Sequence, residues 1–129
     1  MRPTWDEYYL SMVNLVSSRS PCHSIKVGAI ITLNNRVIST GYNGPPKKVG
    51  HCKKCTKVNH CYKAIHAEVN AIIQSGEVKN GILYCTHSPC IECAKIILNA
   101  GIIKVRYIQL YHDNREDSIK YLYKYGVDI

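Results

Sequence analysis

The feature that most constrains the fold is the alternation of strand-like and helix-like hydrophobic patterns along the chain. Apolar residues alternate from Val27 to Leu33, the pair Asn34-Asn35 is typical of a turn, and apolar residues resume at Val37-Ile38. This pattern predicts a β-hairpin that runs into the glycine- and proline-containing segment 41–46. The polar segment from Lys47 to Tyr62 has no periodicity and is expected to be a loop.

Four segments have the three- and four-residue spacing of amphipathic helices. They are Trp5 to Arg19, Ile65 to about Gly76, Cys90 to Leu98 with Gly101 closing it, and a last helix around Ile119–Tyr123. The first of them starts with Thr4 and Glu7 at the spacing of a capping box.

Short apolar runs at Ile82–Thr86 and Ile103–Leu110 predict two more strands, and Val127–Ile129 is expected to be a final edge strand. Because strands alternate with helices, we expect helices on both faces of one sheet with right-handed crossovers. The prediction is an α/β fold, a three-layer α/β/α sandwich around a mixed sheet of about five strands. Residues 1–129 are expected to form a single domain.

The seven cysteines need a chemical explanation. Their number is odd and the N-terminus lacks the basic and apolar stretches of a secretory signal, so we expect no disulfide framework. No apolar run approaches the ~18 residues of a membrane span. We therefore expect a soluble, intracellular, cytoplasmic protein with no membrane partner, whose cysteines bind metal or pack as small core residues.

The formal net charge of +8 predicts an affinity for anions. Nucleic acid and small phosphorylated ligands both fit this charge, and so does a solvated surface with an excess of lysine. Charge alone does not choose among them.

Two short motifs carry the chemistry. His66-Ala67-Glu68 opens one predicted helix, and Cys90 and Cys93 open another, 24 positions after the histidine. Residues three apart project from the same side of a helical turn, and a helix N-terminus stabilises thiolate. One imidazole and two thiolates would hold zinc and leave a fourth position for a water of lowered pKa. Glu68 is placed to move protons between that water, a substrate ring nitrogen and departing ammonia.

This pattern, H-x-E followed by P-C-x-x-C, is the signature of zinc nucleobase deaminases. Either half alone is weak evidence, because C-x-x-C also serves redox and structural zinc sites. The alternative is that His66 is a satisfied core residue and that Cys90 and Cys93 are a redox pair or buried thiols. Both halves at two helix starts favour a catalytic metal site.

Beyond this signature, the chain resembles the deoxycytidylate deaminases from about Trp5 to the C-terminus. The resemblance rests on the segments 27–31 (VGAII), 41–46 (GYNGPP), 66–72 (HAEVNAI), 88–95 (SPCIECAK) and 111–113 (YHD). The GYNG-x-P segment discriminates, because tRNA adenosine deaminases and free cytidine deaminases generally lack it.

The resemblance implies hydrolytic conversion of dCMP to dUMP for thymidylate synthesis, in a hexamer activated by dCTP and inhibited by dTTP. Mg²⁺ is a candidate companion of the triphosphate effectors. The implied substrate-binding residues are Asn43, at the deoxyribose, with Ala67 and Ser88. The implied effector-binding residues are Asn43, Gly44 and Pro46, although Asn43-Gly44 is also an ordinary turn pair. Lys47-Lys48 departs from the family, which often has a glycine soon after this motif.

The substrate's 5′-phosphate needs a cation, and the motifs do not identify it. Arg115 is the candidate, because arginine suits bidentate phosphate contact, with Lys47 and Lys48 as alternatives.

A second, structural zinc is expected on the loop before the second helix. Cys52 and Cys55 have zinc-type spacing, and with Cys22 and Cys61 they would form a closed four-thiolate site, in which His51 or His60 replaces one ligand in the alternative sets. Some bacterial and viral deoxycytidylate deaminases have a similar cysteine set. Free reduced thiols are the alternative, and Cys85 is expected in the core.

Other functions remain open at this point. A bifunctional dCMP/dCTP deaminase has the same motifs. A deaminase of RNA or single-stranded DNA is favoured by the net charge, although nucleic acid is not the expected partner. A noncatalytic zinc module built on Cys52, Cys55 and Cys61 would leave Glu68 unexplained.

Overall fold

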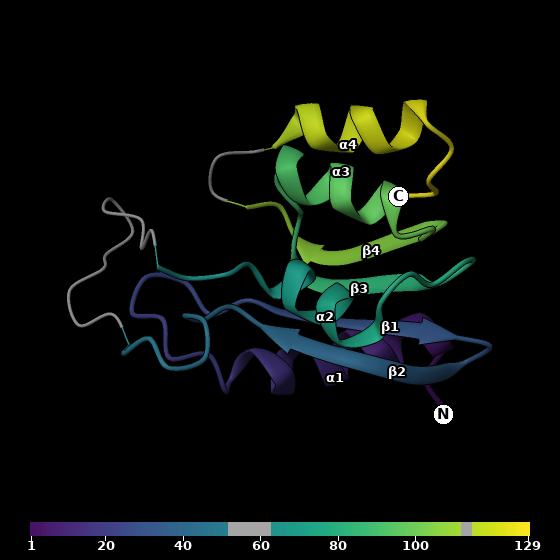
Figure 1. The fold of residues 1–129 in the computed structure, drawn as a ribbon. Helices are drawn as coiled ribbons and strands as arrows, with labels where there is room; N and C mark the ends of the chain where they lie inside the picture. The colour runs from purple at the N-terminus through teal and green to yellow at the C-terminus, as the bar shows by residue number, and fades with distance from the viewer. Residues whose placement is uncertain (52–62, 112–114) are drawn as a thin grey trace.

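A mixed β-sheet forms the centre of the fold in the computed structural model, which describes residues 1–51, 63–111 and 115–129 (Figure 1). Within these ranges the sheet has four strands in the order β2-β1-β3-β4. The strands are β1 (Gly28–Leu33), β2 (Arg36–Tyr42), β3 (Ile82–His87) and β4 (Lys104–Gln109). β1 is antiparallel to both β2 and β3, whereas β3 and β4 are parallel and are joined by a helix.

The predicted hairpin is confirmed, and its turn is built from the asparagine pair. Asn34 and Asn35 have φ values of 52° and 59°. Two successive left-handed residues make a turn that matches the twist of the flanking strands, and asparagine tolerates this backbone better than most residues.

Helices cover both faces of the sheet, which confirms the three-layer fold. The helices are α1 (Trp5–Ser17), α2 (Ala67–Ser75), α3 (Ile91–Asn99) and α4 (Glu116–Lys124). Side chains alternate between faces along each strand. Ile30 and Tyr84 pack against α1, whereas Ile31 and Leu83 belong to the core shared with α2, α3 and α4.

Two glycines let helices approach the sheet closely from opposite sides. A Cβ at Gly28 would overlap the backbone of α1 at Val13 and Ser17, and a Cβ at Gly41 would overlap the backbone of α2 at Ala67 and Ala71. The absence of a side chain at Gly41 in β2 therefore sets the distance between β2 and the first turn of α2.

The expected fifth strand at Val127–Ile129 is reduced to one parallel bridge, between Lys104 and Asp128. Asp128 accepts from Val105 N at 2.8 Å and donates to Ile103 O at 2.9 Å. Gly126, at φ 91°, turns the chain between α4 and this bridge. The described sheet thus has one strand fewer than the sequence pattern suggests.

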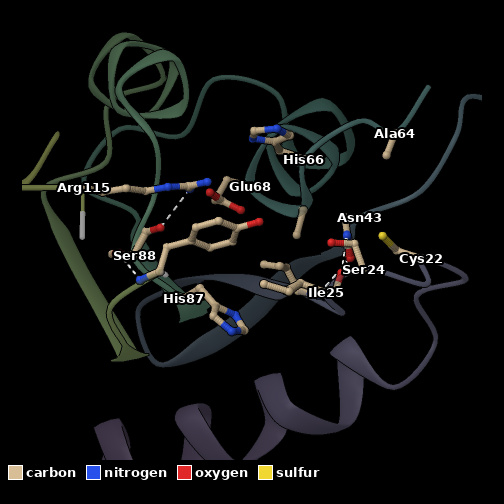
Figure 2. A pocket seen from close by; sticks show the side chains of 13 residues that line it. Cys22, Ser24, Ile25, Asn43, Ala64, His66, Glu68, His87, Ser88 and Arg115 are labelled. Atoms are coloured by element: carbon tan, nitrogen blue, oxygen red, sulfur yellow. Dashed lines mark hydrogen bonds between the residues drawn. The ribbon is translucent and has the colours of Figure 1, made fainter. Parts of the chain in front are cut away.

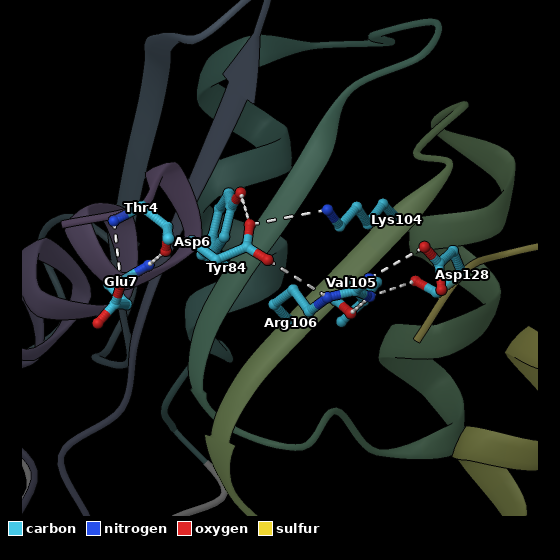
Figure 3. A network of polar contacts seen from close by, with 8 residues as sticks. All are labelled: Thr4, Asp6, Glu7, Tyr84, Lys104, Val105, Arg106 and Asp128. Atoms are coloured by element: carbon cyan, nitrogen blue, oxygen red, sulfur yellow. Dashed lines mark hydrogen bonds and ion pairs between the residues drawn. The ribbon is translucent and has the colours of Figure 1, made fainter.

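A polar network around Asp6 joins α1, the sheet and the C-terminal segment (Figure 3). The Tyr84 hydroxyl donates to Asp6 at 2.6 Å, and Lys104 and Arg106 each lie 3.7 Å from its carboxylate. Arg106 also pairs with Asp128 at 3.0 Å. One carboxylate on the first turn of α1 thereby contacts side chains from both β3 and β4.

The capping box predicted at the start of α1 is confirmed, with Glu7 N donating to Thr4 Oγ1 at 3.1 Å and Thr4 N donating to Glu7 Oε1 at 3.0 Å. No helix in the described ranges has both the length and the apolar character needed to cross a membrane.

Candidate metal centre and pocket

The starts of α2 and α3 bring the two sequence motifs together. His66 is the N-cap of α2 and Cys90 is the N-cap of α3, both with extended backbone, and Cys93 lies one turn into α3. The Cys90 thiol accepts a hydrogen bond from Cys93 N at 3.5 Å, so the Cys90 side chain caps the N-terminus of α3.

The three side chains converge as zinc ligands. His66 Nδ1 lies 3.2 Å from Cys93 Sγ and 3.5 Å from Cys90 Sγ. A tetrahedral zinc with bonds of about 2.3 Å to sulfur and about 2.0–2.1 Å to nitrogen holds these atoms about 3.5 Å apart. The spacing therefore fits the ion. In the described part of the chain, the group consists of these three residues.

The two thiols are not equivalent. Their mutual hydrogen bond lowers the pKa of Cys90, and a hydrogen bond from His66 adds to this effect. The same bond between the thiols, followed by burial, raises the pKa of Cys93. The proton of the pair therefore stays on Cys93, and metal binding would release it because the thiolate is the ligand form.

Glu68 lies beside this group in a buried position. Its exposed fraction is 3%. Burial raises the pKa of the Glu68 carboxyl, while its backbone N–H, His66 and Arg115 act in the opposite direction. A raised pKa makes the Glu68 carboxylate a stronger base than an exposed carboxylate, which suits a group that accepts a proton.

A pocket of about 290 Å³ opens onto these residues (Figure 2). One wall comes from the segment that precedes β1 together with Asn43 after β2. A second wall is His66, Ala67 and Glu68. The third contains His87, Ser88, Tyr111 and Arg115. The pocket thus has the metal donor His66 and a carboxylate in one wall and a guanidinium in another.

Asn43 lines the pocket, but both ends of its amide are bound to backbone. Its Oδ1 accepts from Val27 N at 2.8 Å and its Nδ2 donates to Ile25 O at 2.8 Å. The next residue, Gly44, pairs with Ile65 beside the ligand histidine. Asn43 and Gly44 therefore tie the first wall to the metal centre.

Ser88 and Arg115 organise the third wall. Ser88 is 1% exposed, and its hydroxyl accepts from Tyr111 N at 2.9 Å. Arg115 Nη1 donates to Ser88 O at 3.1 Å, and the guanidinium lies 3.6 Å from the centroid of the Tyr111 ring (Figure 2). Arg115 is the one lysine or arginine among the described residues that line the pocket.

Apart from Cys22, the remaining predicted residues fall outside this pocket or outside the described ranges. Pro46, Lys47 and Lys48 are exposed and do not line it, and His51 is exposed as well. Cys22 lies in the first wall. Cys52, Cys55, His60 and Cys61 are outside the described residues, as are His112 and Asp113 of the YHD segment.

His87 and Tyr111 are among the pocket residues that the motifs did not single out for binding. His87 Nδ1 lies 2.8 Å from the Thr86 hydroxyl and its Nε2 lies 2.7 Å from the side chain of Gln109. Tyr111 packs edge-on against His87. The resemblance in the YHD segment pointed to Tyr111, but no sequence signal marked His87 beyond its place directly before Ser88.

Comparisons with known proteins agree with this geometry. Residues 3–109 match the family described as "Cytidine and deoxycytidylate deaminase zinc-binding region". The dCMP deaminase of cyanophage S-TIM5, solved with dCMP and dUMP, superposes with a TM-score of 0.88 at 34% identity, covering 99% of this chain and 96% of that one. The chain belongs to the deoxycytidylate deaminase family.

Other members of the family differ in length. The deoxycytidylate deaminase of mycobacterium phage D29 is 34% identical over 82% of this chain and 95% of its own length. That of Saccharomyces cerevisiae is 37% identical over the whole chain, and the match spans 45% of the yeast protein. As a deoxycytidylate deaminase family member, the chain has its zinc donors His66, Cys90 and Cys93 inside the matched zinc-binding region.

Proposed function

We propose that this protein hydrolyses dCMP to dUMP and ammonia, and so supplies dUMP for thymidylate synthesis in the cytoplasm. The observation that carries the proposal is one pocket lined by a zinc donor, His66, a buried carboxylate and a guanidinium. The other two zinc donors, Cys90 and Cys93, lie beside His66. A nucleoside monophosphate has the matching groups, an amine-bearing base at one end and a phosphate at the other. The cyanophage relative, whose structure contains dCMP and dUMP, supports this substrate.

In the proposed mechanism, His66, Cys90 and Cys93 would hold a zinc ion, which when bound would lower the pKa of a water molecule to near neutrality and make it available as a nucleophile. Glu68 takes one proton from that water and gives it to the ring nitrogen of the base as the water oxygen adds to the ring carbon. It then takes the proton that remains on this oxygen and passes it to the amine, so that ammonia leaves and a carbonyl forms. Its burial favours the first transfer, because a raised pKa makes the Glu68 carboxylate a stronger base toward the water.

The other pocket residues have binding roles in this proposal. Arg115 contacts the 5′-phosphate through its planar fork of N–H donors. Tyr111 and the Ser88 carbonyl hold the guanidinium in place. Asn43 shapes the sugar end of the pocket through the wall that its amide supports, and Ala67 and Ser88 line the remainder.

Regulation and assembly are finer parts of the same proposal. By family resemblance, dCTP activates and dTTP inhibits a hexamer, Mg²⁺ accompanies these effectors, and Asn43, Gly44 and Pro46 contact them. Residues 1–129 act as one domain. A second zinc is held by Cys22, Cys52, Cys55 and Cys61, with His51 or His60 as alternates, and the spacing of Cys52 and Cys55 supports it.

The test is ammonia release by purified protein from dCMP, dCTP, cytidine and deoxycytidine, each with and without dCTP or dTTP as effector. We expect dCMP to give the highest kcat/KM. Comparable turnover of dCTP would indicate the bifunctional enzyme. Turnover of RNA or single-stranded DNA that falls steeply with salt would instead replace the proposal with a polynucleotide deaminase. Zinc content near two per chain supports the structural site, and a content near one contradicts it.

A further inference from the structure

Ser118 is a buried polar residue of α4 that the mechanism above does not use. Its exposed fraction is 1%. Its hydroxyl lies 2.6 Å from Pro89 O and 2.8 Å from Arg115 O. A hydroxyl has one proton and both neighbours are carbonyl acceptors, so the proton is shared in a three-centre hydrogen bond.

One acceptor belongs to the loop that carries a zinc ligand. Pro89 is buried and directly precedes Cys90. Because a peptide unit is planar, holding the Pro89 carbonyl oxygen also holds the nitrogen and Cα of Cys90. The Ser118 hydroxyl therefore restrains the backbone from which this ligand projects.

The other acceptor belongs to the residue that carries the pocket's cation. Arg115 is the N-cap of α4 and has a left-handed backbone, with φ 20° and ψ 40°. Its carbonyl accepts a hydrogen bond from Ser118, while its guanidinium donates to Ser88 O at 3.1 Å. Ser88 and Pro89 are adjacent, so the contacts close a ring through Ser88, Pro89, Ser118 and Arg115.

We propose that Ser118 is a positioning residue that holds the Arg115 guanidinium at a constant distance from the metal centre. The inference rests on the proposed function, in which Arg115 contacts the phosphate while the base is at the zinc. Both ends of one rigid nucleotide must then be recognised at once. A ring that joins the ligand loop to the cation keeps the distance between the two subsites constant, although Ser118 itself does not line the pocket.

The test is a double-mutant cycle with Ser118→Ala and Arg115→Ala, read as kcat and KM for dCMP. We expect Ser118→Ala to raise KM about tenfold with kcat changed less than about threefold, because binding geometry is lost while the chemical groups remain. In the Arg115→Ala background, Ser118→Ala should change KM less than about twofold, since the residue through which it acts is already absent.

Two further variants complete the design. Ser39→Ala is the matched control, because Ser39 is 3% exposed and its hydroxyl has no hydrogen-bond partner among the described residues. It should leave KM unchanged. Ser118→Thr keeps the hydroxyl and should bring KM back toward the wild-type value. Circular dichroism at the assay temperature verifies that each variant is folded.

Several results would overturn the inference. They are additive effects of the two substitutions, a fall in kcat with KM unchanged, or Ser118→Thr behaving like Ser118→Ala. If wild-type protein releases no ammonia from dCMP, the proposed function fails instead, and the two failures are thereby distinguished.

Discussion

Glu68 is an ionisable residue whose side chain is buried beside the metal ligands. It is a carboxylic acid at 3% exposure with two metal ligands nearby, His66 two positions before it and Cys93 in the first turn of α3. Burying an ionisable group without a purpose is costly, because the charged form loses its hydration. A role in proton transfer explains why a carboxyl, rather than an apolar side chain of similar size, occupies this position.

Glu68→Gln should lower kcat for dCMP by roughly 10²–10⁴-fold, the usual contribution of general acid–base catalysis, because the amide cannot carry the proton. Zinc content and the thermal unfolding midpoint should not fall, since glutamine has nearly the same shape. The exposed Glu77→Gln is the control. Retention of more than a tenth of wild-type kcat would remove Glu68 from the mechanism.

A second single-residue substitution, Cys93→Ser, tests whether Cys93 is a zinc ligand. A serine hydroxyl is a poor zinc ligand compared with thiolate, so the variant should lose one zinc per chain and all detectable turnover. Cys85→Ala is the matched control, because Cys85 is also buried but packs in the core outside the ligand group. Metal analysis after dialysis measures both, and equal zinc loss in the two variants would contradict the assignment.

At the scale of elements, the depth of α2 against the sheet determines where His66 and Glu68 lie. The helix begins with Ala67 over Gly41, where β2 has no side chain. Close contact of helix and strand backbones is what places an N-cap histidine at the mouth of the pocket. The position of the site is therefore a consequence of a glycine 25 residues earlier in the chain.

Gly41→Ala should force α2 away from the sheet, because the added methyl overlaps the Ala67 carbonyl and the Ala71 nitrogen. Overpacking of this kind costs about 1–3 kcal/mol of stability, and kcat should fall because His66 and Glu68 shift together. Chemical denaturation and dCMP turnover measure the two effects. Gly50→Ala, which meets nothing within 4 Å, should change neither.

At the scale of the whole molecule, the Asp6 network connects the first helix to the last segment of the chain. Asp6 is partly exposed, so its ion pairs with Lys104 and Arg106 at 3.7 Å contribute little individually. The Tyr84 hydroxyl bond is different, because the Tyr84 side chain is in the core between α1 and the sheet. This bond joins the first turn of α1 to β3.

Tyr84→Phe should lower the free energy of unfolding by about 1–2 kcal/mol at neutral pH, through loss of a hydrogen bond to a carboxylate. Burial, and then the bond to Asp6, raise the pKa of Tyr84. The protonated form is thus favoured in the folded state, so its contribution is present below the ordinary tyrosine pKa of about 10 and is lost as the pH rises above it.

The measurement is urea denaturation between neutral and strongly alkaline pH. Wild-type stability should fall more steeply above about pH 10 than that of Tyr84→Phe. Tyr123→Phe, at an exposed tyrosine, should follow the wild-type curve. Parallel curves for wild type and Tyr84→Phe would contradict the assigned role of the hydroxyl.

Local sequence determined the elements and the metal donors. Hydrophobic periods of two and about four residues depend on neighbouring positions alone, so the hairpin at Asn34-Asn35, the helices and the central strands could be predicted. The ligands could be predicted as well, because His66, Cys90 and Cys93 lie at helix starts, where capping geometry is local. The substrate class followed from resemblance, with the GYNG-x-P segment as the discriminating motif.

Tertiary structure decided the contacts between segments distant in the chain. The Asn43 amide turns to Ile25 and Val27, His87 reaches Gln109, and Ser118 bridges Pro89 and Arg115. The C-terminal segment pairs through a single bridge rather than a strand. Such hydrogen bonds depend on where packed elements bring two backbones together, and no periodicity in the chain records that. The reactive groups could therefore be predicted from the sequence alone. The residues that fix the positions of these groups relative to one another depend on how the helices and strands pack.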